Sequence, residues 1–442
     1  MERLTPKDTA VLRVENDLIA AHGLTVGVFA GPEPDFAKIR ERVAERVPYV
    51  PRYRQRLVEV PLEIERPVWV NDPNFRVEFH VRHKALPAKG KPEAFRTLVG
   101  QMLSQRIDRG KPLWSLHMVS GLPKKRWALI SKVHYAIVDG VSGTDLLGLL
   151  GDEIETGPPI TRQMPDRLPS ERELVTDALG ELLLNPMESW RVSLGLARRP
   201  ARILRRVVAD LQPGDPAHLG EALGPHRRWA RATVALSDLR KIREANDCST
   251  SDVILACVAA GVHGHLAEAG KPIPPSINAL VPLAVGAATG GLTGQISTLT
   301  AELPLIVDEP QDRLTAIHRQ TSAGAAKTGA IAGEVLRRQG HFVAPTIMGQ
   351  GVRATMLSAR EKRHIDTVAI NVPGPVESIE VLGHPMTEAY PVIPLPGRMR
   401  LACAALSLGE NVQFGITADW DTIDDVQPAA DAIEQAVRDL LP

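Results

Sequence analysis

The chain of 442 residues has little of what marks a secreted or membrane-spanning protein. Its three cysteines, Cys248, Cys257 and Cys403, are widely spaced and odd in number, so we expect small buried side chains in a reducing compartment rather than a disulfide or zinc framework. No uncharged apolar run reaches the about 18 residues of a membrane-spanning helix. Residues 1–8 lack the apolar core of a signal peptide, so the expected location is the cytoplasm.

An excess of either charge sign is also absent. The 52 basic and 52 acidic side chains balance, which removes any global attraction to nucleic acid. The sequence contains no internal repeat, phosphate-binding glycine loop, metal-binding cluster or serine elbow. The apolar fraction of 44% and the charged fraction of 24% are typical of a folded protein, and the length predicts two domains.

The stretch 133–140, Val-His-Tyr-Ala-Ile-Val-Asp-Gly, is the most informative part of the chain. A strand-like run precedes it at 127–133, and a helix-like run follows it at 143–150. Rigid elements on both sides fix the geometry of a short polar segment, which suits it to carry reactive groups. His134 and Asp139 are therefore the first candidates for chemistry.

This stretch resembles the His-His-x-x-x-Asp-Gly signature of acyl-CoA-dependent acyltransferases, and above all that of the bacterial wax ester synthase/diacylglycerol acyltransferase family. Other segments resemble the same family: Leu-Thr-Pro-Lys-Asp at 4–8, Pro-Leu-Trp at 112–114 and Asn-Val-Pro-Gly-Pro at 371–375. The resemblance runs in order from Leu4 to about Asp425, and this extent supports it more strongly than any one motif.

The resemblance implies an α/β fold with two chloramphenicol-acetyltransferase-like domains, each a mixed sheet flanked by helices, and a channel between them. We expect an N-terminal domain at 1–160, a linker with basic amphipathic helices at 161–225 and a C-terminal domain at 226–442. The expected reaction transfers a long-chain acyl group from acyl-CoA to diacylglycerol or a long-chain alcohol. Acyl-CoA is then a substrate, and neither a cofactor nor a metal is expected.

The resemblance also predicts the site. The catalytic candidates are His134, Tyr135 and Asp139, with Asp139 holding the loop through an arginine. The candidates for substrate binding are Pro112, Trp114, Gly140, Gln295 and Asn371. Some of these have a purely structural alternative: a turn with a buried tryptophan at 112–114, and a rigid turn at 371–375.

One departure bears directly on the chemistry, because the family's base is the second histidine and this chain has Tyr135 there. A tyrosine with an unperturbed pKa of about 10 is ionised in roughly one molecule in a thousand at pH 7. His134 could serve instead, or could be a hydrogen-bonded core residue, since neighbours on an extended backbone point to opposite faces. Further departures are Ser115 for Glu, Ser251 for Asn and Gln295 for Asn.

Three functions therefore stay open: an active O-acyltransferase, a catalytically silent or weakened homologue that binds acyl-CoA or lipid, and an acyltransferase for an amine or thiol. Residues 191–206 contain six arginines and no acid among apolar side chains. Such a segment predicts either an inter-domain helix or peripheral contact with an anionic membrane or lipid body. Asp252 near a helix start has a structural explanation through capping.

Overall fold

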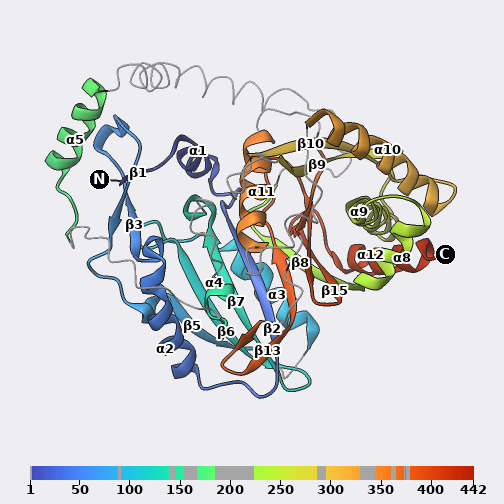
Figure 1. Cartoon of the computed structure of the whole chain (residues 1–442), viewed down its shortest axis with the longest axis horizontal. Coiled ribbons are helices and arrows are strands. Elements are labelled where there is room, and N and C mark those ends of the chain that lie inside the picture. The colour runs from blue at the N-terminus through green and yellow to red at the C-terminus, as the bar shows by residue number, and fades with distance from the viewer. Residues whose placement is uncertain are drawn as a thin grey trace.

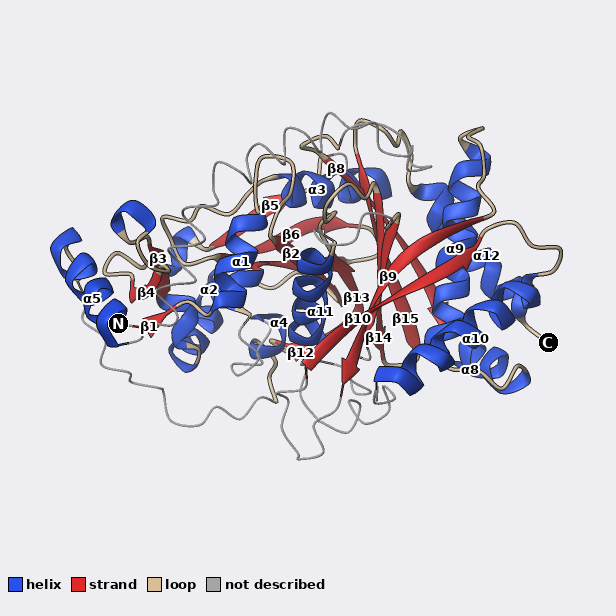
Figure 2. Cartoon of the chain, turned by 90° about the horizontal axis from the view of Figure 1, so that it is seen from above, coloured by secondary structure: helices blue, strands red, loops and turns tan. Residues whose placement is uncertain are grey.

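The computed structural model of the chain describes residues 2–87, 91–138, 146–153, 167–184, 223–285, 295–328, 344–359, 365–372, 374 and 379–442. Two six-stranded sheets form the body of this part, and a small sheet of three strands lies beside the first (Figures 1 and 2). The small sheet has the order β1 (Glu2–Arg3), β4 (Val68–Asn71) and β3 (Gln55–Val58).

The first large sheet is antiparallel except where β5 pairs with β6 in parallel. Its spatial order is β12 (Glu380–Val381), β13 (His384–Val392), β2 (His22–Ala30), β7 (Arg126–His134), β6 (Trp114–Leu122) and β5 (Val81–Ala85).

In the second large sheet, β11 is parallel to both of its neighbours and the other pairs are antiparallel. Its order is β10 (Gln295–Pro304), β9 (Ser276–Val285), β11 (Thr367–Val372), β14 (Leu401–Leu408), β15 (Asn411–Asp419) and β8 (Arg227–Ala235). Both sheets are thus mixed, as expected.

Helices cover the sheets and fill the space between them (Figure 2). Those of the first half are α1 (Pro6–Val14), α2 (Phe36–Arg46), α3 (Pro92–Ser104), α4 (Leu146–Leu149) and α5 (Glu171–Leu184). Those of the second half are α8 (Leu236–Ala245), α9 (Thr250–Glu268), α10 (Pro310–Thr328), α11 (Ala344–Ser358) and α12 (Gln427–Leu440). Short 3-10 turns are η1 (Val47–Tyr49), η2 (Pro51–Arg54), η3 (Pro61–Glu63), η4 (Val77–Phe79) and η5 (Tyr135–Ile137).

Strand β13 joins the two halves of the molecule. It comes late in the sequence but hydrogen-bonds to β2 in the first sheet, with Val392 opposite Leu24. Its Glu388 carboxylate accepts hydrogen bonds from Arg126 on β7 (2.7 Å) and Arg231 on β8 (2.5 Å), one residue from each sheet. The expected boundaries at 160 and 226 remain predictions, and this exchange of a strand is a feature that they did not include.

The backbone of β13 also lies directly against the second sheet. A Cβ atom at Gly415 on β15 would stand 1.7 Å from the carbonyl oxygen of Pro391. Only glycine allows this approach, because the atom in the way belongs to the backbone of a paired strand and cannot rotate aside.

Periodicity predicted several elements well. The pattern of apolar residues predicts helices at 36–46 and 171–184 and a strand at 77–81. Both helices are confirmed, and Asp35 caps the first of them through the N–H of Ala37 (2.9 Å). The strand expected at 77–81 is wrong: residues 77–79 form η4, because Phe79 and His80 donate their N–H groups to carbonyls three residues earlier. All three cysteines are free; Cys257 and Cys403 are buried, as predicted, whereas Cys248 is only partly buried.

Within the described ranges, α9 alone has the length and apolarity of a membrane-spanning helix. About two thirds of its apolar window (67%) is buried inside the protein, against the sheet and α12, as in the core helix of a globular domain.

Replacing Gly415 by alanine tests the joint at β13. The added methyl has no room beside Pro391, so we expect the free energy of unfolding to fall by about 1–3 kcal/mol, measured by urea titration. Gly180→Ala in α5 is the control, since nothing lies within 4 Å of its Cβ position, and it should gain up to about 1 kcal/mol from helix propensity. Equal stability of Gly415→Ala and the parent would contradict the close approach.

Candidate active site

The central motif lies where β7 ends and η5 begins. Side chains of β7 alternate between the two faces of the sheet, and Ala128 and Ile130 face the core beneath α3. Lys132 lies on the same face, since its ammonium donates to the carbonyl of Met102 near the end of α3 (2.8 Å). His134, the last residue of the strand, therefore belongs to the α3 face.

His134 is fully buried, and of its two ring nitrogens only Nδ1 has a hydrogen-bond partner among the described residues. Nδ1 accepts a hydrogen bond from the backbone N–H of Ala136 (3.0 Å), so the proton of the neutral ring resides on Nε2. Nε2 lies 3.6 Å from the carboxylate of Glu15, whose side chain is only 2% exposed. His134 thus has the contacts of a hydrogen-bonded core residue, and neither nitrogen presents a free lone pair to a substrate.

Glu15, which has a buried side chain, and Arg109, which is partly exposed, lie behind His134, and sequence reasoning assigned a role to neither. The guanidinium of Arg109 donates to one Glu15 oxygen through Nε (2.9 Å) and Nη2 (2.5 Å), and also to the carbonyl of Leu12 (2.9 Å). Burial alone would raise the pKa of Glu15, but the contacts with His134 and Arg109 prevail and lower it to about 2. The side chain is therefore a carboxylate at neutral pH.

Tyr135 points to the other side of the turn. Its N–H donates to the carbonyl of Ala21 (2.8 Å), and its ring packs between β2 and α11. A Cβ at Gly23 would lie 2.1 Å from the Tyr135 hydroxyl oxygen, and one at Gly349 would lie 3.5 Å from the ring. Burial raises the pKa of the phenol above its ordinary value. The hydroxyl can therefore donate a hydrogen bond but does not act as a base at neutral pH.

A side chain from the second half of the protein binds the end of the same turn. Arg353 on α11 donates to the carbonyl of Val138 and to the carboxylate of Asp8 in the first turn of α1. Asp139 and Gly140, two of the predicted site residues, lie outside the described residues. The turn is thus held from α1 and β2 on one side and from α11 on the other.

Pro112 and Trp114 are buried beside the motif, at the start of β6. The indole N–H of Trp114 donates to the carbonyl of Tyr53 (2.7 Å), and its ring stacks on His80 with centroids 4.6 Å apart. Such contacts are those of a core residue packed beside the motif. His80 contacts the Trp114 carbonyl (2.9 Å), whereas His83 contacts the hydroxyl of Ser120 (2.5 Å). The two histidines therefore do not point toward a common ligand such as a metal ion.

Asn371 is the last residue but one of β11 and donates through its side-chain amide to the hydroxyl of Ser251 in the first turn of α9 (3.2 Å). The turn that follows β11 requires glycine, because a Cβ at Gly374 would lie 1.8 Å from the carbonyl oxygen of Ser407. Gln295 begins β10, and its side chain is outside the described part. These contacts bring together Asn371 and Ser251, two positions selected from the sequence for different reasons.

Asp252, next to Ser251, has the structural role that was expected. It forms a capping box with Ser249, and its carboxylate also contacts His318 (2.8 Å) and Thr321 (2.6 Å) on α10. Its oxygens are therefore used to join two helices.

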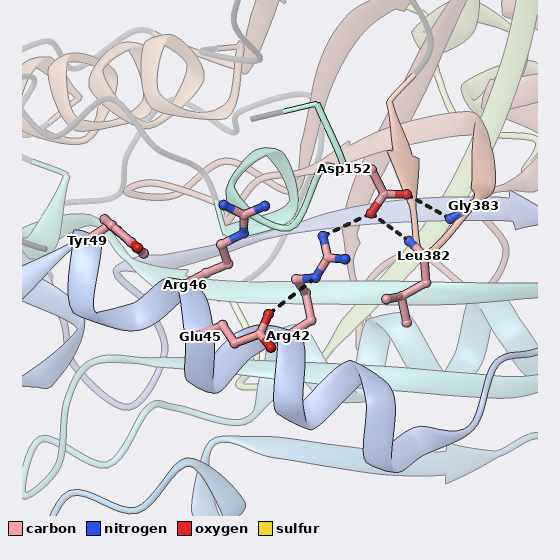
Figure 3. Close-up of a pocket in the computed structure, with 7 residues that line it drawn as sticks. All are labelled: Arg42, Glu45, Arg46, Tyr49, Asp152, Leu382 and Gly383. Carbon is pink, nitrogen blue, oxygen red and sulfur yellow. Dashed lines mark hydrogen bonds and ion pairs between the residues drawn. The ribbon is translucent and has the colours of Figure 1, made fainter. Parts of the chain in front are cut away.

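A separate open cavity of about 630 Å³ lies away from the motif, between α2 and the β12–β13 turn (Figure 3). Its lining is polar and consists of Arg42, Glu45, Arg46, Tyr49, Asp152, Leu382 and Gly383. Asp152 pairs with Arg42 (2.9 Å) and accepts the N–H groups of Leu382 (3.1 Å) and Gly383 (2.7 Å). The positive charges of two guanidinium groups balance the negative charges of two carboxylates in this cavity. None of the predicted site residues lines it.

The described ranges contain no group of three or more His, Cys, Asp or Glu side chains that could hold a metal ion.

The lowered pKa of Glu15 predicts how stability depends on pH. The folded-state pKa of about 2 is below the ordinary value of 4.5, so the stabilisation is complete above pH 4.5 and is lost as the pH falls toward 2. Urea unfolding should show the advantage of the parent over Glu15→Gln shrinking by about 3 kcal/mol across this window. An advantage that stays constant from pH 7 to pH 2 would contradict the assignment.

Comparison with known proteins gives the family of the chain. Residues 4–254 match the wax ester synthase/diacylglycerol acyltransferase catalytic domain, and residues 293–441 match the C-terminal domain of the same family. A relative in Mycobacterium tuberculosis H37Rv, tgs1, named as a probable diacylglycerol O-acyltransferase, is 28% identical over 100% of this chain and 96% of its own. A second relative from that strain, Rv3087, named for the same activity, is 30% identical over 85% of this chain and 84% of its own.

Solved structures share the fold. The wax ester synthase/diacylglycerol acyltransferase from Marinobacter aquaeolei VT8 superposes with a TM-score of 0.69 at 24% identity, covering 99% of this chain and 98% of that one. The starter condensation domain of rhizomide synthetase in complex with C8-CoA and Leu-SNAC has a TM-score of 0.54 at 12% identity, covering 100% and 93%. The expected α/β fold with two chloramphenicol-acetyltransferase-like domains is confirmed. The chain belongs to the wax ester synthase/diacylglycerol acyltransferase family and is an acyl-CoA-dependent acyltransferase.

Proposed function

We propose that the protein transfers a long-chain acyl group from acyl-CoA to the hydroxyl of a diacylglycerol or a long-chain alcohol. The observation that carries this proposal is the motif turn at the end of β7, which α1, β2 and α11 hold together at the junction of the two halves. The names of the mycobacterial relatives support diacylglycerol as the acceptor. Asp139, Gly140, Asn371, Gln295, Pro112 and Trp114 remain the proposed residues of the site beside His134 and Tyr135.

In this reaction the acceptor oxygen bonds to the thioester carbonyl carbon, the carbon–sulfur bond to CoA breaks, and the acceptor proton ends on the CoA sulfur. An imidazole accelerates such a step because it takes the proton near neutral pH. The phenol of Tyr135 stays protonated, so it is suited to donate a hydrogen bond to the carbonyl oxygen as negative charge develops there. We therefore expect slow ester formation with ordinary alcohols.

A second candidate is a catalytically silent homologue that binds acyl-CoA or lipid. The observation that favours it is the loss of a base: Tyr135 replaces the family's histidine, and both nitrogens of His134 have neighbours in the core. A third, a thiol or amine acceptor, follows from the same loss, because a thiol ionises more readily than an alcohol and a neutral amine is the stronger nucleophile, so both depend less on a base.

An assay of the purified protein with labelled palmitoyl-CoA and a panel of alcohol, diacylglycerol, amine and thiol acceptors distinguishes these functions. We expect the parent to form ester slowly and Tyr135→His to form it faster by about 10²-fold, since a general base contributes that much or more. Tyr135→Phe is the matched control, because it keeps the ring packing and removes only the hydroxyl.

Each outcome of that assay has a meaning. Ester formation by Tyr135→His alone would favour the silent homologue, and thioester or amide formation by the parent would favour the third candidate. Absence of acyl transfer from both proteins to every acceptor would contradict the proposed function.

We also propose that the protein works in the cytoplasm and contacts the inner membrane or lipid bodies peripherally, where its lipid acceptors reside. The support is the acid-free stretch at 191–206 with six arginines, which lies outside the described residues. Basic segments of this kind are attracted to anionic lipid headgroups.

Vesicle binding tests this proposal. Binding to anionic liposomes should exceed binding to neutral ones and should weaken at 1 M salt, where the Debye length is about 3 Å. Replacement of the six arginines by glutamine should have the same effect as salt. Equal binding of the parent to neutral and anionic vesicles would contradict an electrostatic contact.

A further inference from the structure

We propose that Glu15 is a positioning residue of the acyl-transfer site: it holds the proton of His134 on Nε2 and thereby fixes the turn that carries Tyr135. The inference deepens the proposed function, and it rests on that function for its kinetic test alone. Its basis is a chain of contacts from Glu15 through His134 to the backbone of η5.

The first step is the conformation of His134. Its Nδ1 accepts the N–H of Ala136, two residues further on, as the side-chain oxygen of asparagine does in an Asx turn. This bond exists only while Nδ1 carries no proton. If the proton moved to Nδ1, two N–H groups would face each other and the turn would lose its closure.

The second step is the choice between the two tautomers. The Glu15 carboxylate stands 3.6 Å from Nε2 in a region closed to water, so negative charge on that side favours a proton on Nε2. Arg109 keeps Glu15 ionised by donating to it at 2.9 and 2.5 Å. The carboxylate and its arginine together select the form of His134 that the turn requires.

A second contact leads from Glu15 to the same turn. Its other oxygen accepts the N–H of Ala21 (3.4 Å), and the carbonyl of Ala21 accepts the N–H of Tyr135 (2.8 Å). The two residues that define the turn, His134 and Tyr135, are thus both tied to one buried carboxylate.

Helix α1 acts as a brace across the turn. Asp8 in its first turn binds Arg353, which holds the Val138 carbonyl at the end of η5, while Glu15 follows its last residue and contacts His134 at the beginning. Glu15 thus reaches the His134 ring directly and the Tyr135 N–H through Ala21, at the end of the turn opposite to the one that Arg353 holds.

The structural test is the tautomer of His134, read from the ring nitrogens by ¹⁵N NMR with His134→Asn for assignment. We expect Nε2–H in the parent and a loss of that single form in Glu15→Leu, which removes the acceptor while Arg109, with a side chain 36% exposed, turns to water. The control is Glu388→Leu. It removes a different carboxylate, which two arginines bind, at a point of the same sheet far from His134. It should lower the melting temperature without changing the ring of His134.

The kinetic test uses the parent or Tyr135→His, whichever turns over. His134→Asn keeps an acceptor for the Ala136 N–H and should stay within about tenfold of the starting kcat, whereas His134→Leu should fall by about 10²-fold with little change in KM. Glu15→Leu should lower kcat in the same way. Its effect should shrink in the His134→Asn background, where no Nε2 remains to be oriented.

Three results would overturn the proposal: an unchanged His134 tautomer in Glu15→Leu, equal loss of kcat in Glu15→Leu and Glu388→Leu, or a His134→Asn protein as inactive as His134→Leu. The last result would make His134 the base. If no protein turns over, the proposed function fails while the NMR comparison still decides the role of Glu15. If Glu15→Leu does not fold, Glu15→Gln replaces it in the NMR comparison, because it keeps the shape of the side chain and removes the charge that favours a proton on Nε2.

Discussion

The close contact of β13 with both sheets is the constraint on which the rest of the structure depends. The strand gives its backbone hydrogen bonds to β2, while Pro391 touches Gly415 and Glu388 binds an arginine from each sheet. Two mixed sheets that merely abutted could slide or rotate against each other. A strand that belongs to one sheet and packs directly on the other permits one arrangement, and the motif turn is bound by α11 of the second half as well as by α1 of the first.

That arrangement explains why neighbouring residues of the motif have different roles. His134 is the last residue of β7 and points to the α3 face, whereas Tyr135 begins η5 and points to α11. An extended backbone separates adjacent side chains in this way, so His134 cannot take the place of the family's second histidine without breaking its bond to Ala136. The substitution at Tyr135 therefore removes a proton acceptor and leaves the turn itself intact.

Features that depend on residues close together in the sequence could be predicted from it. The helix at 36–46 follows from apolar residues at helical spacing, and the opposite orientations of His134 and Tyr135 follow from the period of a strand. The transfer of β13 to the first sheet could not be predicted, because pairing between β13 and β2 depends on residues more than 350 positions apart. Glu15 gave no signal either: it lies in the polar run Glu-Asn-Asp at 15–17, which predicts an exposed loop, and its burial depends on Arg109, 94 residues away.

The energetics of Glu15 favour a role beyond stability. Moving a carboxylate from water into a site where only 2% of its side chain is exposed is costly, and its attraction to Arg109 recovers that cost only in good geometry. A well-packed apolar side chain often stabilises such a position equally well. An apolar side chain cannot distinguish the two tautomers of His134, since both forms of the ring are neutral and have the same shape. An acceptor facing Nε2 separates them, a charged one most strongly, and the bond from Ala136 to Nδ1 requires that separation. The turn that Glu15 helps to specify therefore explains why a carboxylate, and not an apolar side chain, occupies this buried position.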